Sequence, residues 1–150
     1  MGLYYLETSA LVKLYVREPG TEGLLRLASR SVENHFAVLS LSQVELRSAI
    51  RRRERAGDIS TTIASLLLDR FEQHMETRFL RQVLSDTVVD RAVKLVDLHA
   101  LRAYDAVQLA GCLTLKVLSG SEAPVFVCSD RQLLSAAQSE HLTTLNPEDL

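Results

Sequence analysis

Four acidic residues of this chain stand where carboxylates could do chemistry together. Glu7 and Asp130 each follow a short apolar run, whereas Glu45 and Asp105 lie near helix starts in otherwise apolar surroundings. Buried carboxylates cost several kcal/mol unless they are paired or bound to a metal. A divalent cation would therefore stabilise four carboxylates that converge. Because oxygen ligands without Cys or His suit hard cations, the set favours Mg²⁺, with Mn²⁺ as a substitute, over zinc.

The elements that must position these acids alternate along the chain. Five apolar runs are expected to form strands, at about residues 3–6, 35–39, 79–84, 124–128 and 142–145. Apolar residues at helical spacing lie between them and predict helices, two of which form a hairpin at about 41–76. This alternation predicts an α/β fold with a mostly parallel central sheet of four or five strands, flanked by helices. No linker or repeat divides the sequence, so we expect 1–150 to be a single domain.

Each acid taken singly has a simpler interpretation. An acid after a strand often serves only as an N-cap or first-turn residue, where the helix dipole favours negative charge. Glu45 is followed by Arg47 and could instead be an ordinary exposed acid or form a local ion pair. Ligands of parallel sheets, however, bind where strand carboxyl ends meet helix N-termini. All four acids are expected at that edge, which capping alone would not require.

Composition narrows the setting of such a site. The net charge of −2 excludes a general polycation, so any contact with nucleic acid must come from a local basic patch. Cys112 and Cys128 lie inside apolar runs and are expected to be buried free thiols, which is typical of a reducing cytoplasm. No segment reaches the roughly 18 apolar residues of a membrane span, and no signal peptide is evident. We expect a cytoplasmic protein with no membrane partner.

Four segments resemble, in order and spacing, the acidic motifs of PIN-domain ribonucleases, and specifically VapC-like toxins of type II toxin–antitoxin systems. They are YLETSALVKLYVREPG, SQVELRSAI, LRAYDAVQLA and VFVCSD. The resemblance covers about residues 3–131, and its first and third segments are the most specific. It implies a PIN-like three-layer fold. The catalytic and metal-binding residues that it implies are Glu7, Glu45, Asp105 and Asp130.

The resemblance also implies an activity and partners. The chain would be a divalent-metal-dependent endoribonuclease, a hydrolase of RNA phosphodiester bonds that acts as a toxin. Thr8, Ser9 and Ser129 would orient the carboxylates or a phosphate, and Arg102, one turn before Asp105, would contact phosphate. Its partners would be the RNA substrate and a VapB-like antitoxin, in a homodimer or a higher toxin–antitoxin assembly. We also expect the hairpin to present apolar side chains such as Leu68 to a partner.

Other interpretations stay open. The family's first motif carries Asp where this chain has Glu7, so the chain could be a catalytically impaired PIN-fold binding protein. It could also be a PIN nuclease of RNA processing, unrelated to toxin–antitoxin systems. A response-regulator receiver domain also places acids around Mg²⁺. It would need an adjacent acid pair early in the chain and a Lys after the last strand, where this sequence has Asp130.

Overall fold

The computed structural model describes residues 2–30 and 32–150. Its five strands are β1 (Gly2–Leu6), β2 (Asn34–Leu39), β3 (Phe79–Gln82), β4 (Val125–Val127) and β5 (Thr143–Leu145). The helices are α1 (Thr8–Val12), α2 (Thr21–Ser29), α3 (Ser42–Arg55), α4 (Thr61–Thr77), α5 (Asp86–Leu98), α6 (Ala103–Ser119) and α7 (Arg131–Ser139), followed by a short 3-10 helix (Pro147–Asp149).

The strands form one parallel sheet in the order β3-β2-β1-β4-β5. The predicted α/β architecture and all five predicted strands are therefore confirmed. Two expected strands end earlier than predicted: β3 stops at Gln82 and β4 at Val127. Beyond Gln82 the chain leaves the sheet, and the Leu84 amide donates instead to the Ser40 hydroxyl at 2.9 Å.

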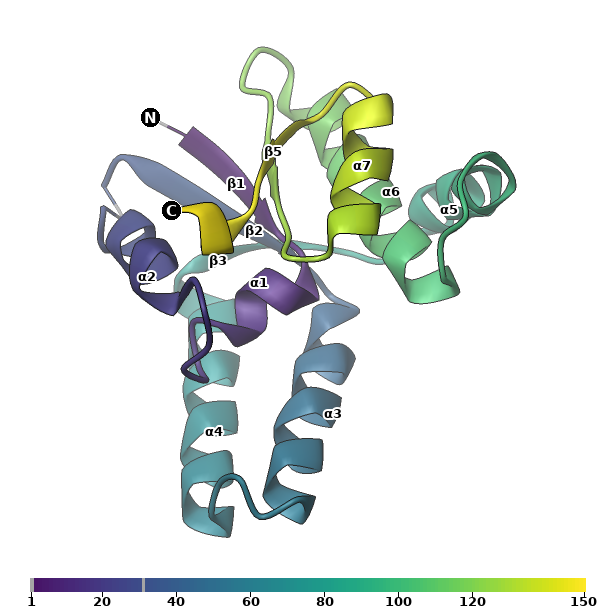
Figure 1. Cartoon of the computed structure of the whole chain (residues 1–150). Coiled ribbons are helices and arrows are strands. Elements are labelled where there is room, and N and C mark those ends of the chain that lie inside the picture. The colour runs from purple at the N-terminus through teal and green to yellow at the C-terminus, as the bar shows by residue number, and fades with distance from the viewer. Residues whose placement is uncertain (1, 31) are drawn as a thin grey trace.

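Helices cover both faces of this sheet and form two apolar cores (Figure 1). Successive side chains of a strand point to opposite faces, so Tyr5 packs into one core and Leu6 into the other. Helices α5, α6 and α7 cover the Tyr5 face, whereas α1 to α4 cover the Leu6 face. Figure 1 also shows α3 and α4 side by side as the predicted hairpin, extending away from the sheet.

The hairpin buries the side chains that we expected it to present. Leu68 and Met75 are both buried in the core beneath α4, together with Phe71. The expectation that Leu68 faces a partner is therefore wrong. Leu66 on the same helix is exposed instead, because α4 carries more apolar residues than the core beneath it can bury.

Cys112 and Cys128 are buried free thiols, as predicted. Within residues 2–30 and 32–150, no helix combines the length and the hydropathy needed to cross a membrane.

The packing of α6 against β1 depends on Gly111. A Cβ built at this position would stand 2.4 Å from the Tyr5 hydroxyl oxygen and 3.3 Å from a methyl of Leu39. Both neighbours are fully buried and have little room to move. We expect Gly111→Ala to lower the free energy of unfolding by about 1–3 kcal/mol, as overpacking of a core does. Urea denaturation measures this loss.

A second variant tests the cause. Tyr5→Phe removes the oxygen that the new Cβ would meet. The double variant Tyr5→Phe/Gly111→Ala should therefore lose less free energy of unfolding than the sum of the losses in the two single variants. Strict additivity of the two losses would show that the contact between Gly111 and Tyr5 is not the source of the effect.

Candidate active site

The four predicted acids lie at the carboxyl edge of the sheet. Since β1, β2 and β4 are parallel, their ends share that edge. Glu7 is the N-cap of α1 directly after β1, and Asp130 is the N-cap of α7 after β4. Glu45 lies in the first turn of α3, which follows β2, and Asp105 in the first turn of α6. Each acid thus has the helix-start position predicted from the sequence.

Glu7 is buried, and its side chain turns back onto its own helix. One carboxylate oxygen, Oε2, accepts hydrogen bonds from the Ser9 amide at 2.9 Å and the Ser9 hydroxyl at 2.5 Å. The Ser9 oxygen in turn accepts from the Ser129 amide at 3.0 Å, which ties α1 to the loop after β4. Burial raises the pKa of Glu7 to about 7, against the lowering effect of the Ser9 hydrogen bonds; the nearby Glu45 charge raises it further.

Glu45 is held by a different set of donors. Its Oε1 atom accepts from the Thr8 hydroxyl at 2.9 Å and from the Gln108 amide nitrogen at 2.7 Å. Thr8 and Ser9, the two hydroxyl residues predicted beside Glu7, therefore serve different carboxylates. Thr8 contacts Glu45, and Ser9 contacts Glu7.

Asp105 and Asp130 form the other half of the site. Asp105 is half-buried, and burial raises its pKa; the Asp130 charge adds to this, whereas the Arg102 charge opposes it. Arg102 is the N-cap residue of α6 and is exposed, so its guanidinium is available to a ligand beside Asp105. Asp130 is exposed, and its Oδ1 accepts from the Leu133 amide at 3.1 Å.

The acids thus stand as two neighbouring pairs, Glu7 with Glu45 and Asp105 with Asp130. Among residues 2–30 and 32–150, no three Asp, Glu, His or Cys side chains are close enough together to hold one metal ion. The donor set nevertheless fits Mg²⁺ or Mn²⁺ in kind, since all four acids offer hard oxygens. In addition, the Ser129 hydroxyl is buried without a hydrogen-bond partner in the described structure. Such an orphaned group calls for a ligand or water.

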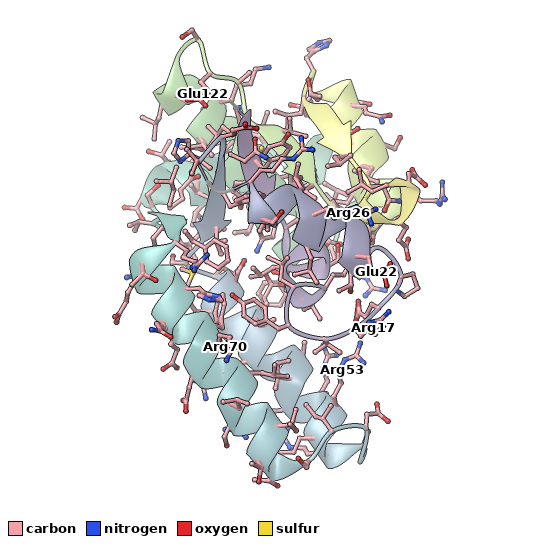
Figure 2. The ribbon with its side chains drawn as sticks, turned by 90° about the vertical axis from the view of Figure 1, so that its left-hand side faces the viewer. Arg17, Glu22, Arg26, Arg53, Arg70 and Glu122 are labelled. Atoms are coloured by element: carbon pink, nitrogen blue, oxygen red, sulfur yellow. The ribbon has the colours of Figure 1, made fainter. Side chains whose placement is uncertain are left out.

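A hollow of about 480 Å³ adjoins the site beyond Ser9. Lys13, Arg52 and Arg53 line it together with Glu18 and Asp58. Lys13 is buried and lies 3.3 Å from Glu18, which Arg53 also contacts. In Figure 2, Arg53 is drawn just below Arg17 and Glu22.

A larger hollow, of about 780 Å³, lies elsewhere in the fold. It opens at the amino ends of β2 and β3, where Asn34 and Phe79 line it, and it contains none of the four acids. The candidate active site is therefore the edge of the sheet that carries the four carboxylates, and not this hollow.

Sequence reasoning missed three polar residues of this region: Gln108, Tyr5 and Lys13. Gln108 is completely buried on α6, three residues after Asp105. The only signal for it was an amide inside an apolar helix, AVQLAGCL, which must find a partner when buried. Lys13 gave a similar signal, as a lone cation among apolar residues of α1 and its extension.

Known proteins resemble this chain in sequence over most of its length. Residues 4–118 match the PIN domain family. The chain belongs to this family. Ribonuclease VapC35 of Mycobacterium tuberculosis is 32% identical over 147 residues, which cover 97% of each chain. The resemblance to VapC-like PIN-domain proteins is thus confirmed.

Solved structures agree on the fold of this PIN-domain chain. VapBC2 from Rickettsia felis, bound to a DNA fragment from its promoter, superimposes with a TM-score of 0.66 at 15% identity, over 96% of this chain and 98% of the other. FitAcB from Neisseria gonorrhoeae superimposes with a TM-score of 0.67 at 15% identity, over 98% and 99%. The predicted PIN-like fold is confirmed.

Proposed function

We propose that this PIN-domain chain is a divalent-metal-dependent endoribonuclease and the toxin of a toxin–antitoxin pair. The observation that carries the proposal is the gathering of Glu7, Glu45, Asp105 and Asp130 at one edge of the sheet. The name of its relative, Ribonuclease VapC35, supports RNA as the substrate. The buried free thiols of Cys112 and Cys128 support a cytoplasmic setting.

The four acids would hold Mg²⁺ or Mn²⁺ in this proposal. A bound cation would polarise the phosphoryl group, lower the pKa of an attacking water and stabilise the leaving oxygen. Glu45 or Asp130 would orient that water and accept its proton. Arg102 would neutralise a phosphate beside Asp105. The Ser129 hydroxyl, which has no hydrogen-bond partner among the described residues, would donate to a phosphate oxygen.

Further surfaces would serve RNA and protein partners. Arg52 and Arg53 in the hollow next to Ser9 suit the phosphates that flank the scissile bond. A VapB-like antitoxin is the proposed protein partner, because the neighbouring R. felis structure is a VapBC2 complex. Val89, Val93 and Val96 form an exposed apolar stripe on α5 that supports a homodimer or a larger toxin–antitoxin assembly.

The direct test is cleavage of a structured RNA by the purified chain. We expect cleavage with Mn²⁺ and none with EDTA. A parallel arm uses Glu7→Asp, which restores the acid usual in the family's first motif. If only this variant cleaves, the natural chain is a catalytically impaired PIN protein. If neither cleaves nor binds Mn²⁺, the metal-dependent nuclease proposal is wrong.

Inhibition of the same cleavage reaction by an antitoxin distinguishes a toxin from a nuclease of RNA processing. A small gene encoding a VapB-like protein immediately upstream, whose product stops the cleavage, would support the toxin assignment. Cleavage that no such product inhibits would favour RNA processing.

A further inference from the structure

Gln108 lies at the centre of a buried polar network that joins four elements of the fold. Its amide nitrogen, Nε2, lies 2.7 Å from Glu45 Oε1, 2.9 Å from Ser42 Oγ and 3.2 Å from Thr8 Oγ1. Its carbonyl oxygen accepts from the Tyr5 hydroxyl at 2.9 Å. Gln108, Tyr5 and Ser42 are all completely buried. The network therefore connects β1, α1 and α3 to α6.

Glu45 decides which end of the Gln108 amide faces it, because a carboxylate only accepts hydrogen bonds whereas the Tyr5 hydroxyl can donate or accept. In the observed orientation the Tyr5 hydroxyl donates its hydrogen to the amide oxygen of Gln108. If the amide were flipped, its oxygen would instead face the carboxylate of Glu45, two acceptors in contact. The arrangement with Nε2 toward Glu45 is therefore the one that satisfies both ends of the side chain.

The hydrogen count then distinguishes the two oxygens of Glu45. The amide nitrogen has two hydrogens, which go to its shorter contacts, Glu45 Oε1 and Ser42 Oγ. The Thr8 hydroxyl donates to Glu45 Oε1 as well, so that oxygen receives two hydrogens. Among the described residues none donates to Glu45 Oε2, and that atom is not buried. One oxygen is thus held by the protein and the other is left open.

We propose that Gln108, held by a hydrogen bond from Tyr5, is a positioning residue that fixes Glu45 so that Oε2 faces the cation of the site. The proposal rests on the metal-dependent function proposed above. Neither residue touches the cation in this scheme; both act through Glu45. Partners that orient a metal-binding carboxylate typically change metal affinity or activity by about 10- to 100-fold when they are removed.

Metal binding to the full chain tests this directly. Gln108→Met keeps the length of the side chain and removes both amide functions. We expect its Mn²⁺ affinity, measured by titration calorimetry, to fall by about 10- to 100-fold. Tyr5→Phe should lower the affinity in the same direction by a smaller factor. RNA cleavage by either variant should recover when Mn²⁺ is raised to saturation, which a misfolded protein would not show.

Gln82→Met is the matched control. The Gln82 amide also donates to α6, at 2.7 Å from the Gly111 carbonyl oxygen, but it contacts none of the four acids. The control should lose stability and keep the wild-type Mn²⁺ affinity. Should Gln108→Met fail to fold, Tyr5→Phe decides the question, because it removes a single hydrogen bond.

A double variant with Glu45 shows whether Gln108 acts by positioning Glu45 or only by stabilising the fold. If Gln108 acts through Glu45, Gln108→Met should cause no further loss of Mn²⁺ affinity in a Glu45→Gln background. Equal losses in both backgrounds would overturn the proposal. The proposal would also be overturned if folded Gln108→Met bound Mn²⁺ with wild-type affinity while Glu45→Gln bound it weakly. In that case the proposed metal site would still stand. If the wild type binds no Mn²⁺, both proposals fall.

Discussion

Replacing Asp105 with asparagine should lower Mn²⁺-dependent RNA turnover by about a hundredfold to a thousandfold. The substitution keeps the shape of the side chain and removes one charge from the site. Stabilisation of transition-state charge by a bound cation is worth several kcal/mol, and each 1.36 kcal/mol corresponds to about tenfold in rate. The Asp130 charge raises the pKa of Asp105, so removing the carboxylate also relieves a repulsion and should not unfold the protein.

The matched control is Asp86→Asn. Asp86 occupies the first turn of α5, as Asp105 does in α6, but it is exposed and is not one of the four acids. Initial rates of RNA cleavage at saturating Mn²⁺, together with circular dichroism spectra, compare the two variants. Wild-type turnover in Asp105→Asn would remove this residue from the site. An equal loss in Asp86→Asn would show that the effect comes from helix stability.

The location of Glu7 and Asp130 could be predicted from the sequence because it depends only on their following strands of a parallel sheet. A parallel sheet brings the carboxyl ends of β1, β2 and β4 to the same edge. Any acid that follows such a strand, as Glu7 and Asp130 do, reaches that edge without further information. The hairpin was predictable for a similar reason, since the helical spacing of apolar residues is a local pattern.

The contacts within the site could not be predicted in this way. Gln108 meets Thr8 and Glu45 across 100 and 63 residues of sequence, and no local pattern encodes such a meeting. The turn of Glu7 toward Ser9 depends on burial of its carboxylate, which only the packed protein determines. Leu68 illustrates the same limit, because periodicity shows that α4 has an apolar side but not which neighbour covers it.

Replacing Glu7 with glutamine should stabilise the metal-free protein, and only at high pH. The pKa of Glu7 in the folded chain is about 7, against an ordinary value of 4.5. Below the ordinary value the carboxyl group is protonated in both folded and unfolded chains. Between the two values the unfolded chain ionises while the folded one keeps its proton, so the free energy of unfolding falls as pH rises. A pKa difference of this size corresponds to on the order of 3 kcal/mol.

Glutamine has no proton to lose, and its carbonyl oxygen can still accept both hydrogen bonds from Ser9. We therefore expect Glu7→Gln to exceed the wild type by on the order of 3 kcal/mol in urea denaturation near pH 8 with EDTA, and to equal it near pH 4.5. Comparing the two proteins cancels the titration of all other groups, including Asp105. A stability difference that is the same at both pH values would show that ionisation of Glu7 is not its cause.

Added Mn²⁺ connects this penalty to the proposed function. A cation that binds the folded chain stabilises it by mass action, and it does so most where it meets an ionised carboxylate. At pH 8 the wild type should gain more stability from Mn²⁺ than Glu7→Gln gains, so the difference between them should narrow. The buried charge of Glu7 would then be a cost that the protein bears until a cation arrives. Equal gains in both proteins would mean that Glu7 does not bind the ion.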